Sequence, residues 1–191
     1  MKNRKTMQNE KIQKNKEKGE NNYAFIDGAN LYKGVSDLGW KLDYARLRVW
    51  LTEKYNVKMA YIFIGLIPSY KDLYKYLQES GFILVYKEVI YDNNGKPKGN
   101  CDADLVLQTV IDTYEKKFDR AVVVSSDGDY AGLVKFLLNR NKLKTVLSPH
   151  TKDTCSILLK RTEAKISYIN DQRFLLEIRE KEKAPDGDKT P

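Results

Sequence analysis

The sequence predicts an α/β fold in which an open parallel β-sheet lies between helices, a three-layer α/β/α sandwich. Five short apolar runs are rich in β-branched and aromatic residues, as strands covered on both faces are. Longer amphipathic stretches lie between them, and this alternation continues for about 150 residues, as in parallel sheets. The predicted strands are residues 23–26, 59–66, 82–86, 121–124 and 144–147.

The amphipathic stretches predict helices because their apolar residues recur at helical spacing. The predicted helices are residues 42–55, 70–79, 103–117 and 130–139, with two more at 156–161 and 170–179 around a short segment, 165–169. In the third helix the expected buried stripe is Ala103, Leu107, Val110, Ile111 and Tyr114.

The composition predicts one folded domain over residues 23–179, with polar segments at both ends. Residues 1–22 and 180–191 contain almost no apolar side chains, so we expect a disordered basic arm and a disordered tail. Of the formal net charge of +8, +4 belongs to residues 1–22 and +5 to residues 23–176. A mildly basic body favours a polyanionic partner.

Several classes of protein are excluded by what the sequence contains. The two cysteines, Cys101 and Cys155, are far apart and form no CxxC pair, which argues against a disulfide framework and a thiolate zinc site and favours a cytoplasmic protein. We expect no membrane span and no signal peptide, because no sufficiently long apolar run is present. His150 is the single histidine, so we expect no Ser/His/Asp triad.

Acidic residues follow two of the predicted strands. Asp27 and Asn30 come after the first strand, and Ser126, Asp127 and Asp129 come after the fourth. Ligands of open α/β sheets bind at the carboxyl ends of strands where the strand order reverses, so neighbouring first and fourth strands would bring Asp27 and Asp127 together. Turn formation or helix N-capping is an equally good explanation for Asp27 and Asp129, and it is compatible with a site.

A third group of acids opens the helix at 103–117. Asp102 and Asp104 are two residues apart, so on a helix they point to opposite faces and cannot enter one pocket. Asp102 is the better site candidate, Asp104 suits a first-turn acid, and Asp112 is expected at the surface. Lys96 and Lys98 precede this helix in a polar loop, where they contact phosphates or simply belong to a solvated hairpin-like loop.

Three separated acidic groups in a basic domain indicate metal-assisted phosphodiester chemistry. Carboxylates that lie close together repel one another unless a cation lies between them, and Mg²⁺ or Mn²⁺ prefers oxygen ligands. The cation supplies a nucleophilic water and offsets charge on phosphorus.

Three motifs resemble those of the NYN domain, in the LabA-like branch of the PIN-like nuclease superfamily. They are Phe25-Ile26-Asp27-Gly28-Ala29-Asn30-Leu31-Tyr32, Lys98-Gly99-Asn100-Cys101-Asp102-Ala103-Asp104-Leu105 and Val123-Val124-Ser125-Ser126-Asp127-Gly128-Asp129-Tyr130. They occur in the family's order, and the similarity covers residues 23–160. The resemblance implies a PIN-like sandwich with strand order 3-2-1-4-5 and metal-dependent RNA cleavage.

The resemblance also implies roles for individual residues. Asp27, Asp102 and Asp127 would hold Mg²⁺ or Mn²⁺, with Asp129 as a further catalytic acid and Asn30 in support. The candidate RNA contacts are Asn30, Tyr32, Lys33, Lys96, Lys98 and Ser126, with Tyr32 placed to stack on a base of single-stranded RNA. Gln108 departs from the family pattern, because many relatives carry an acid or His there, and this weakens the case for a second metal.

Two alternatives remain open from the sequence. The first is a catalytically weak or inactive NYN module that binds RNA or regulates, which Gln108 and the modest body charge favour. The second is a phosphotransfer enzyme with Asp27 as covalent acceptor, although Ala29 stands where haloacid-dehalogenase-type enzymes carry a second Asp. The sequence leaves the oligomeric state open, a homo-oligomer included.

Overall fold

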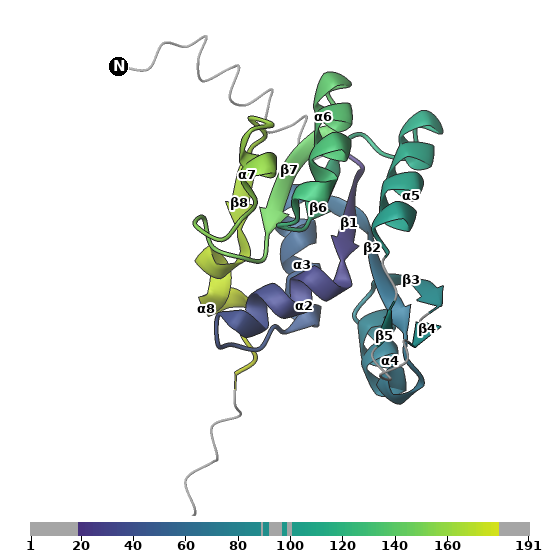
Figure 1. Ribbon diagram of the computed structural model, residues 1–191, viewed down its shortest axis with the longest axis vertical. Helices are drawn as coiled ribbons and strands as arrows, with labels where there is room; N and C mark the ends of the chain where they lie inside the picture. Colours follow the sequence, from purple (N-terminus) through teal and green to yellow (C-terminus); the bar gives the residue numbers. More distant parts are fainter. Residues whose placement is uncertain (1–18, 89, 92–96, 99–100, 180–191) are drawn as a thin grey trace, which may run out of the picture.

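The central feature of the protein, seen in a computed structural model, is a six-stranded sheet with the order β3-β2-β1-β6-β7-β8 (Figure 1). The structure describes residues 19–88, 90–91, 97–98 and 101–179. Every neighbouring pair of strands in this sheet is parallel. The strands are β1 (Asn22–Asp27), β2 (Val57–Leu66), β3 (Ile83–Glu88), β6 (Ala121–Val124), β7 (Leu143–Ser148) and β8 (Ile166–Tyr168).

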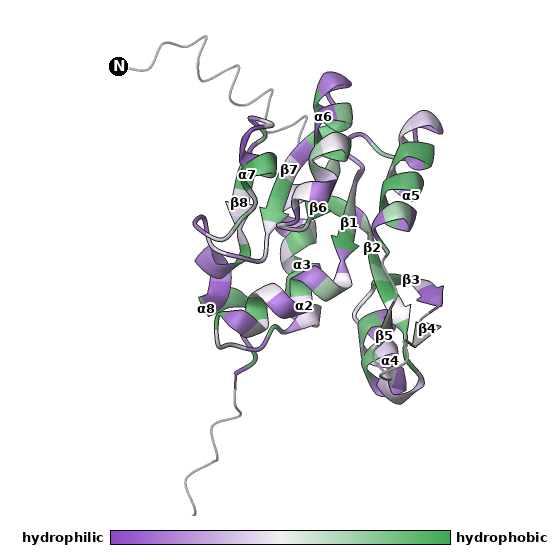
Figure 2. Ribbon diagram, viewed as in Figure 1, coloured by the Kyte–Doolittle hydropathy of each residue, from purple (hydrophilic) through white to green (hydrophobic). Residues whose placement is uncertain are grey.

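Helices cover both faces of the sheet, which confirms the predicted α/β/α sandwich. Side chains of β1 alternate between two cores: Ala24 and Ile26 join one, and Phe25 joins the other. The first core includes residues of α2 (Gly28–Asp37), α3 (Tyr44–Tyr55), α4 (Lys71–Glu79) and α8 (Arg173–Leu176). The second includes residues of α5 (Asp102–Tyr114), α6 (Ala131–Asn139) and α7 (Ile157–Lys160). Figure 2 shows the strands as largely hydrophobic, as burial on both faces requires.

Three short 3₁₀ helices and a hairpin complete the described elements. The 3₁₀ helices are η1 (Pro68–Tyr70), η2 (Gly128–Tyr130) and η3 (Ile169–Gln172). Antiparallel pairing joins β4 (Ile90–Tyr91) to β5 (Pro97–Lys98), within the polar loop expected before α5. Residues 92–96 and 99–100 of this loop lie outside the described residues.

The predicted strand order 3-2-1-4-5 is confirmed and extended by one strand. The first and fourth predicted strands, β1 and β6, are hydrogen-bonded neighbours, with Ile26 opposite Val124. The segment at 165–169 contributes β8 at the edge of the sheet, which was not predicted as a strand from the sequence. A further difference is α2, where the sequence pattern predicted only a turn at the start.

The predicted buried stripe of α5 was wrong. Leu107 and Tyr114 are 59% and 66% exposed, and Ala103 and Ile111 are also exposed. The helix instead buries Leu105, Thr109, Asp112 and Thr113, so the expected surface position of Asp112 was also wrong.

Described structure is present before the predicted domain boundary at residue 23. Glu20 forms ion pairs with Arg120 and Lys144, and Asn22 is the first residue of β1. Residues 1–18 of the expected arm and residues 180–191 of the expected tail lie outside the described residues. Among the helices that the structure describes, none combines the length and apolarity needed to cross a membrane.

Candidate metal centre

Four aspartates gather where β1 and β6 end and α5 begins. Asp27 is the last residue of β1, Asp102 is the first of α5, and Asp127 and Asp129 follow β6. The pairing of β1 with β6 brings Asp27 to the same edge of the sheet as Asp127 and Asp129, because both strands are parallel. This convergence was expected from the sequence.

Local hydrogen bonds fix two of these carboxylates. Asp27 caps α2, with its Oδ1 accepting from the backbone N–H of Asn30 at 3.0 Å. Asp127 caps η2 in the same way, accepting from the N–H of Asp129 at 3.1 Å. Asp27 therefore has the N-cap role that the sequence allowed, whereas η2 is capped by Asp127, and Asp129 lies in its first turn. Each capping aspartate keeps a second carboxylate oxygen for other partners.

Tyr130 joins two of the acidic groups from beneath. Its side chain is 1% exposed, and its hydroxyl contacts both Asp102 Oδ1, as a short hydrogen bond, and Asp27 Oδ2, at 3.3 Å. Burial, Asp27 and Asp102 all raise the pKa of Tyr130, so the hydroxyl keeps its proton and remains a donor. This role of Tyr130 was not predicted from the sequence, although the residue ends the third motif directly after Asp129.

Three of the aspartates are close enough to share one cation. Asp102, Asp127 and Asp129 each place a carboxylate oxygen within 4.8 Å of the others. Asp102 is partly buried and Asp129 is exposed, so the cluster opens to solvent on one side. Asp27 lies behind it, 8% exposed, and reaches Asp102 through the hydroxyl of Tyr130. An all-oxygen donor set fits a hard divalent cation such as Mg²⁺ or Mn²⁺.

The electrostatics of the site are those of crowded carboxylates. Burial raises the pKa of Asp27, and the neighbouring Asp102 and Asp127 raise it further. Burial also raises the pKa of the Cys101 thiol to about 11, with Asp104 and Asp27 adding to the effect. Cys101 therefore stays a neutral thiol beside the cluster at neutral pH and is not a thiolate ligand.

Asn30 and Ser126 connect the two loops that carry the acids. Asn30 Oδ1 accepts from the backbone N–H of Ser126 at 3.0 Å and from its hydroxyl at 2.9 Å. Ser126 Oγ lies 2.6 Å from His150 Nδ1, and His150 Nε2 lies 3.8 Å from a carboxylate oxygen of Asp37. Because Ser126 donates its proton to Asn30, His150 Nδ1 must be the donor to Ser126. A serine nucleophile needs the opposite arrangement, in which the serine hydroxyl donates its proton to the histidine.

The remaining acids of α5 have other partners. Asp104 forms an ion pair with Lys87 at 2.9 Å, which agrees with the prediction that Asp102 and Asp104 point apart. Gln108 donates to Asp112 at 2.8 Å, and Lys117 contacts the same oxygen at 3.0 Å. The side chain of Gln108, at the position where many relatives carry an acid or His, is therefore bound to Asp112.

The predicted RNA contacts are distributed along α2 and the hairpin. Tyr32, 68% exposed, and Lys33, also exposed, lie on α2. Lys98 belongs to β5, where its backbone pairs with Ile90, and Lys96 lies outside the described residues. The side chains of Asn30 and Ser126 are hydrogen-bonded to each other, so they contribute to the site by holding its two loops together.

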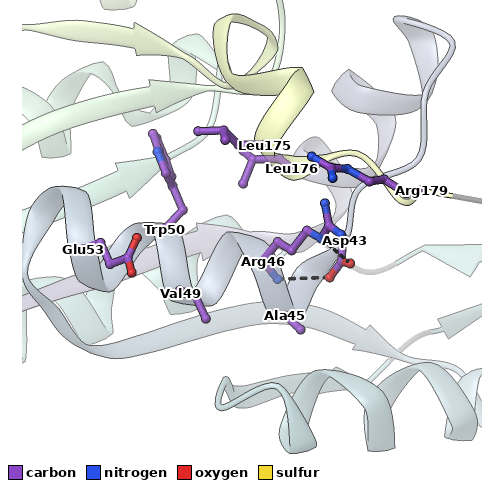
Figure 3. Close-up of a pocket in the computed structure, with 9 residues that line it drawn as sticks. All are labelled: Asp43, Ala45, Arg46, Val49, Trp50, Glu53, Leu175, Leu176 and Arg179. Carbon is purple, nitrogen blue, oxygen red and sulfur yellow. Dashed lines mark hydrogen bonds and ion pairs between the residues drawn. The ribbon is translucent and has the colours of Figure 1, made fainter.

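An open groove of 520 Å³ lies between α3 and α8, and none of the four clustered aspartates lines it (Figure 3). It is lined by two acids and two arginines around apolar side chains: Asp43, Glu53, Arg46 and Arg179 with Ala45, Val49, Trp50, Leu175 and Leu176. Figure 3 shows Arg46 turned toward Asp43, to which it is ion-paired at 3.3 Å. The balanced charge and the internal pairing give it no preference for a polyanion.

The fold and the site together define an α/β protein whose acids converge at the carboxyl ends of its two central strands. The model of the NYN domain family matches residues 23–169, and the chain belongs to this family, within the PIN-like nuclease superfamily. Nucleases of this superfamily typically use divalent metals, which agrees with the oxygen donors of the cluster.

One solved structure with the same fold is a crystal structure of a protein of unknown function from Vibrio parahaemolyticus RIMD 2210633. It has a TM-score of 0.68 and 24% identity, over 82% of this chain and 96% of that one. This likeness supports the fold alone. No curated protein matches the chain.

Proposed function

We propose that the protein is a metal-dependent ribonuclease that hydrolyses phosphodiester bonds of single-stranded RNA. The observation that carries the proposal is the cluster of Asp102, Asp127 and Asp129, whose carboxylate oxygens lie within 4.8 Å of one another. Without a cation such a cluster is repulsive, and the NYN domain is a nuclease-type domain. We place the chain in the LabA-like branch on the strength of its three motifs.

Asp102 and Asp127 are the proposed ligands of Mg²⁺ or Mn²⁺, and Asp27 completes the set when the Tyr130 hydroxyl releases its Oδ2. A bound cation would supply a nucleophilic water and offset charge on the phosphate. Asp129, the exposed acid, orients that water or binds as a further ligand. Asn30 accepts two hydrogen bonds from Ser126, which precedes Asp127, and so keeps the loop that carries Asp127 close to the loop that carries Asp27.

RNA fits the surroundings of this site better than a small phosphate ester does. The cluster is open to solvent, and the formal charge of residues 23–176 is +5, which favours a long polyanion. Lys33 on α2 and Lys96 and Lys98 in the loop before α5 are the proposed phosphate contacts. Tyr32 is the proposed stacking side chain.

The test is cleavage of a panel of labelled single-stranded RNAs with Mg²⁺ or Mn²⁺. We expect turnover with the unmodified chain and a loss of at least about 100-fold in Asp127→Asn, since the amide is a poor ligand for a hard cation. Glu53→Gln is the matched control, because it removes one exposed negative charge away from the cluster. Equal cleavage by the Asp127→Asn variant and the unmodified chain would contradict the proposal.

One observation favours a second candidate, an NYN module that binds RNA with little or no turnover. Gln108 takes the place of an acid or His and is bound to Asp112, so it does not supplement the ligand set. This candidate predicts salt-sensitive RNA binding with no cleavage under either metal. The same RNA panel therefore separates the two candidates.

A further inference from the structure

Helix α5 carries a stripe of apolar side chains on its outer side. The stripe consists of Ala103, Leu107, Ile111 and Tyr114, which are spaced so that they lie along one side of the helix. All four are exposed, whereas the side of α5 that faces the core buries Leu105 next to two threonines and an aspartate. A continuous apolar stripe, unlike single exposed apolar residues, marks an interaction surface.

The position of α5 leaves this stripe open to a partner. Figure 1 shows α5 as the outermost helix on its side of the sheet, next to α6, and Figure 2 shows much of the helix as hydrophobic. The stripe ends against α6, where the ring centroids of Tyr114 and Phe136 are 6.1 Å apart. Arg140 Cζ lies 4.0 Å from the ring centroid of Phe136, and Arg140 donates to the Tyr114 hydroxyl at 3.2 Å. These contacts hold an aromatic ring and a cation together at the C-terminal end of the stripe.

The sizes of the side chains in the stripe fit a second copy of the same helix. When two copies of α5 pack antiparallel about a two-fold axis near residues 108–109, Leu107 lies opposite Ile111 of the other copy. In the same register Ala103, the smallest side chain of the stripe, lies opposite Tyr114, the largest. A parallel pairing would place the two copies of Tyr114 against each other, with no small residue to make room. Two-fold interfaces are the commonest in homo-oligomers.

The charges at the two ends of α5 also favour antiparallel pairing. The N-terminal end is acidic, because Asp102 belongs to the cluster of three aspartates, which stays negative with one divalent cation bound. Asp104 at this end is ion-paired with Lys87. The C-terminal end is basic, with three cations against two acids: Lys116, Lys117 and Arg140 against Asp112 and Glu115. Antiparallel packing brings each acidic end beside a basic one.

We propose that the stripe on α5 is the interface of a homodimer, in which the α5 helices of two copies of this chain pack antiparallel across a two-fold axis. Arg140 of each copy then lies near the first turn of α5 in the other copy, at the edge of its aspartate cluster. A helix of 13 residues is about 20 Å long, so the interface is small, and we expect a dissociation constant of about 1–100 µM. The dimer needs neither metal nor RNA, so it goes beyond the proposed function and does not depend on it.

The experiment is sedimentation velocity of the full chain in EDTA, from about 1 µM to about 500 µM, which spans the expected dissociation constant. Leu107→Glu places a charge near the centre of the interface. Ile157→Glu is the matched control, because Ile157 on α7 is 57% exposed against 59% for Leu107. The register is tested by exchanging sizes, with Ala103→Tyr alone and combined with Tyr114→Ala. Circular dichroism checks that each variant is folded.

We expect the unmodified chain and Ile157→Glu to dimerise equally, and Leu107→Glu to weaken the dimer at least about 30-fold, because burying an unpaired carboxylate is costly. Ala103→Tyr should weaken the dimer about tenfold or more, because two large rings then meet in one space. Adding Tyr114→Ala should restore part of the lost affinity.

A monomer at every concentration, or a dimer that Leu107→Glu leaves unchanged, would overturn the proposal. A combined variant that dimerises no better than Ala103→Tyr would overturn the antiparallel register. A dimer that fails to cleave RNA would instead count against the proposed function alone.

Discussion

At the scale of single residues, Asp27 shows how closely spaced carboxylates strain the protein that carries them. Its carboxylate is buried beside Asp102 and Asp127, and burial with these neighbours raises its pKa. Asp27 accepts hydrogen bonds from the N–H of Asn30 and from the Tyr130 hydroxyl, and this hydroxyl, which has a single proton, is shared with Asp102. We conclude that the metal-free site is retained at a cost in stability.

Asp27→Asn should therefore stabilise the metal-free protein at neutral pH. A carboxyl with a raised folded pKa binds more protons in the folded chain, so stability falls as pH rises above its unfolded pKa. Asparagine removes this cost and is an equally good N-cap. We expect a gain of about 0.5–2 kcal/mol in urea unfolding with EDTA at pH 7. The gain should vanish near pH 3, where Asp27 is protonated in the unmodified chain too.

The control for this comparison is Glu53→Gln, which removes an exposed charge and should change stability at neither pH. A destabilised Asp27→Asn variant at pH 7 would show that the fold holds Asp27 favourably in its ionised form, which is the opposite of the expected result.

At the scale of elements, α2 depends on a glycine that allows a close approach. A Cβ on Gly34 would lie 2.8 Å from both His150 Nδ1 and the Cβ of Pro149, which is too close for unbonded atoms. Gly34 therefore lets α2 pack against the loop after β7, where His150 reaches Ser126.

Gly34→Ala should destabilise the protein by about 1–3 kcal/mol, because the clash outweighs the better helix propensity of alanine. Gly132→Ala is the matched control: it lies in α6, and its added Cβ meets nothing within 4 Å. We expect the control to be neutral or to stabilise by up to about 1 kcal/mol. Thermal unfolding of the two variants measures the difference, and equal melting temperatures would refute this role of Gly34.

The same elements show where sequence patterns predict structure and where they do not. The strands at 121–124 and 59–66 were predicted because burial on both faces makes them continuously apolar. Helix α2 was not, since Gly28 and Gly34 have low helix propensity and are kept for close packing. Strand β8 is a three-residue edge strand, too short for periodicity to show.

The buried face of helix α5 was predicted wrongly for a different reason. This face carries polar residues whose hydrogen bonds are made within the helix: Thr109 and Thr113 each donate to the carbonyl four residues earlier, at 2.7 Å. Asp112 is paired with Gln108 and Lys117. A pattern based on apolar residues alone therefore selects the opposite, exposed face.

At the scale of the whole molecule, residues before the sheet bind its strands together. Glu20 accepts hydrogen bonds from Asn22, from Arg120 ahead of β6, and from Lys144 in β7. Burial raises the pKa of Glu20, but these hydrogen bonds outweigh it and hold the pKa at about 2.

The Glu20 network should stabilise the fold above pH 5 and be lost in acid. A carboxyl with a lowered folded pKa contributes stability above its unfolded pKa of about 4.3, and this contribution disappears as pH falls toward 2. Glu20→Gln should cost on the order of 1 kcal/mol at pH 7 and little at pH 2. Urea unfolding across this range checks the difference, and parallel curves for the two chains would refute it.

The acids of the site could be predicted from the sequence, and the adjacency of the strands that carry Asp27 and Asp127 was predicted from the resemblance to the NYN domain. Asp102 was separated from Asp104 by helix geometry. Tyr130 was missed because its importance lies in its contacts with Asp102, 28 residues away in the sequence, and with Asp27, 103 residues away. Such contacts leave no periodic signal.

The central claim is that these aspartates hold a divalent cation, and a crystal soaked with Mn²⁺ tests it most directly. Anomalous scattering locates Mn²⁺ independently of any activity assay. We expect one strong peak bound by oxygens of Asp102 and Asp127, at about 2.0–2.2 Å, with Asp27 or Asp129 completing the protein ligands. No peak among these aspartates, with Tyr130 still bonded to Asp27 and Asp102 at saturating Mn²⁺, would contradict the claim.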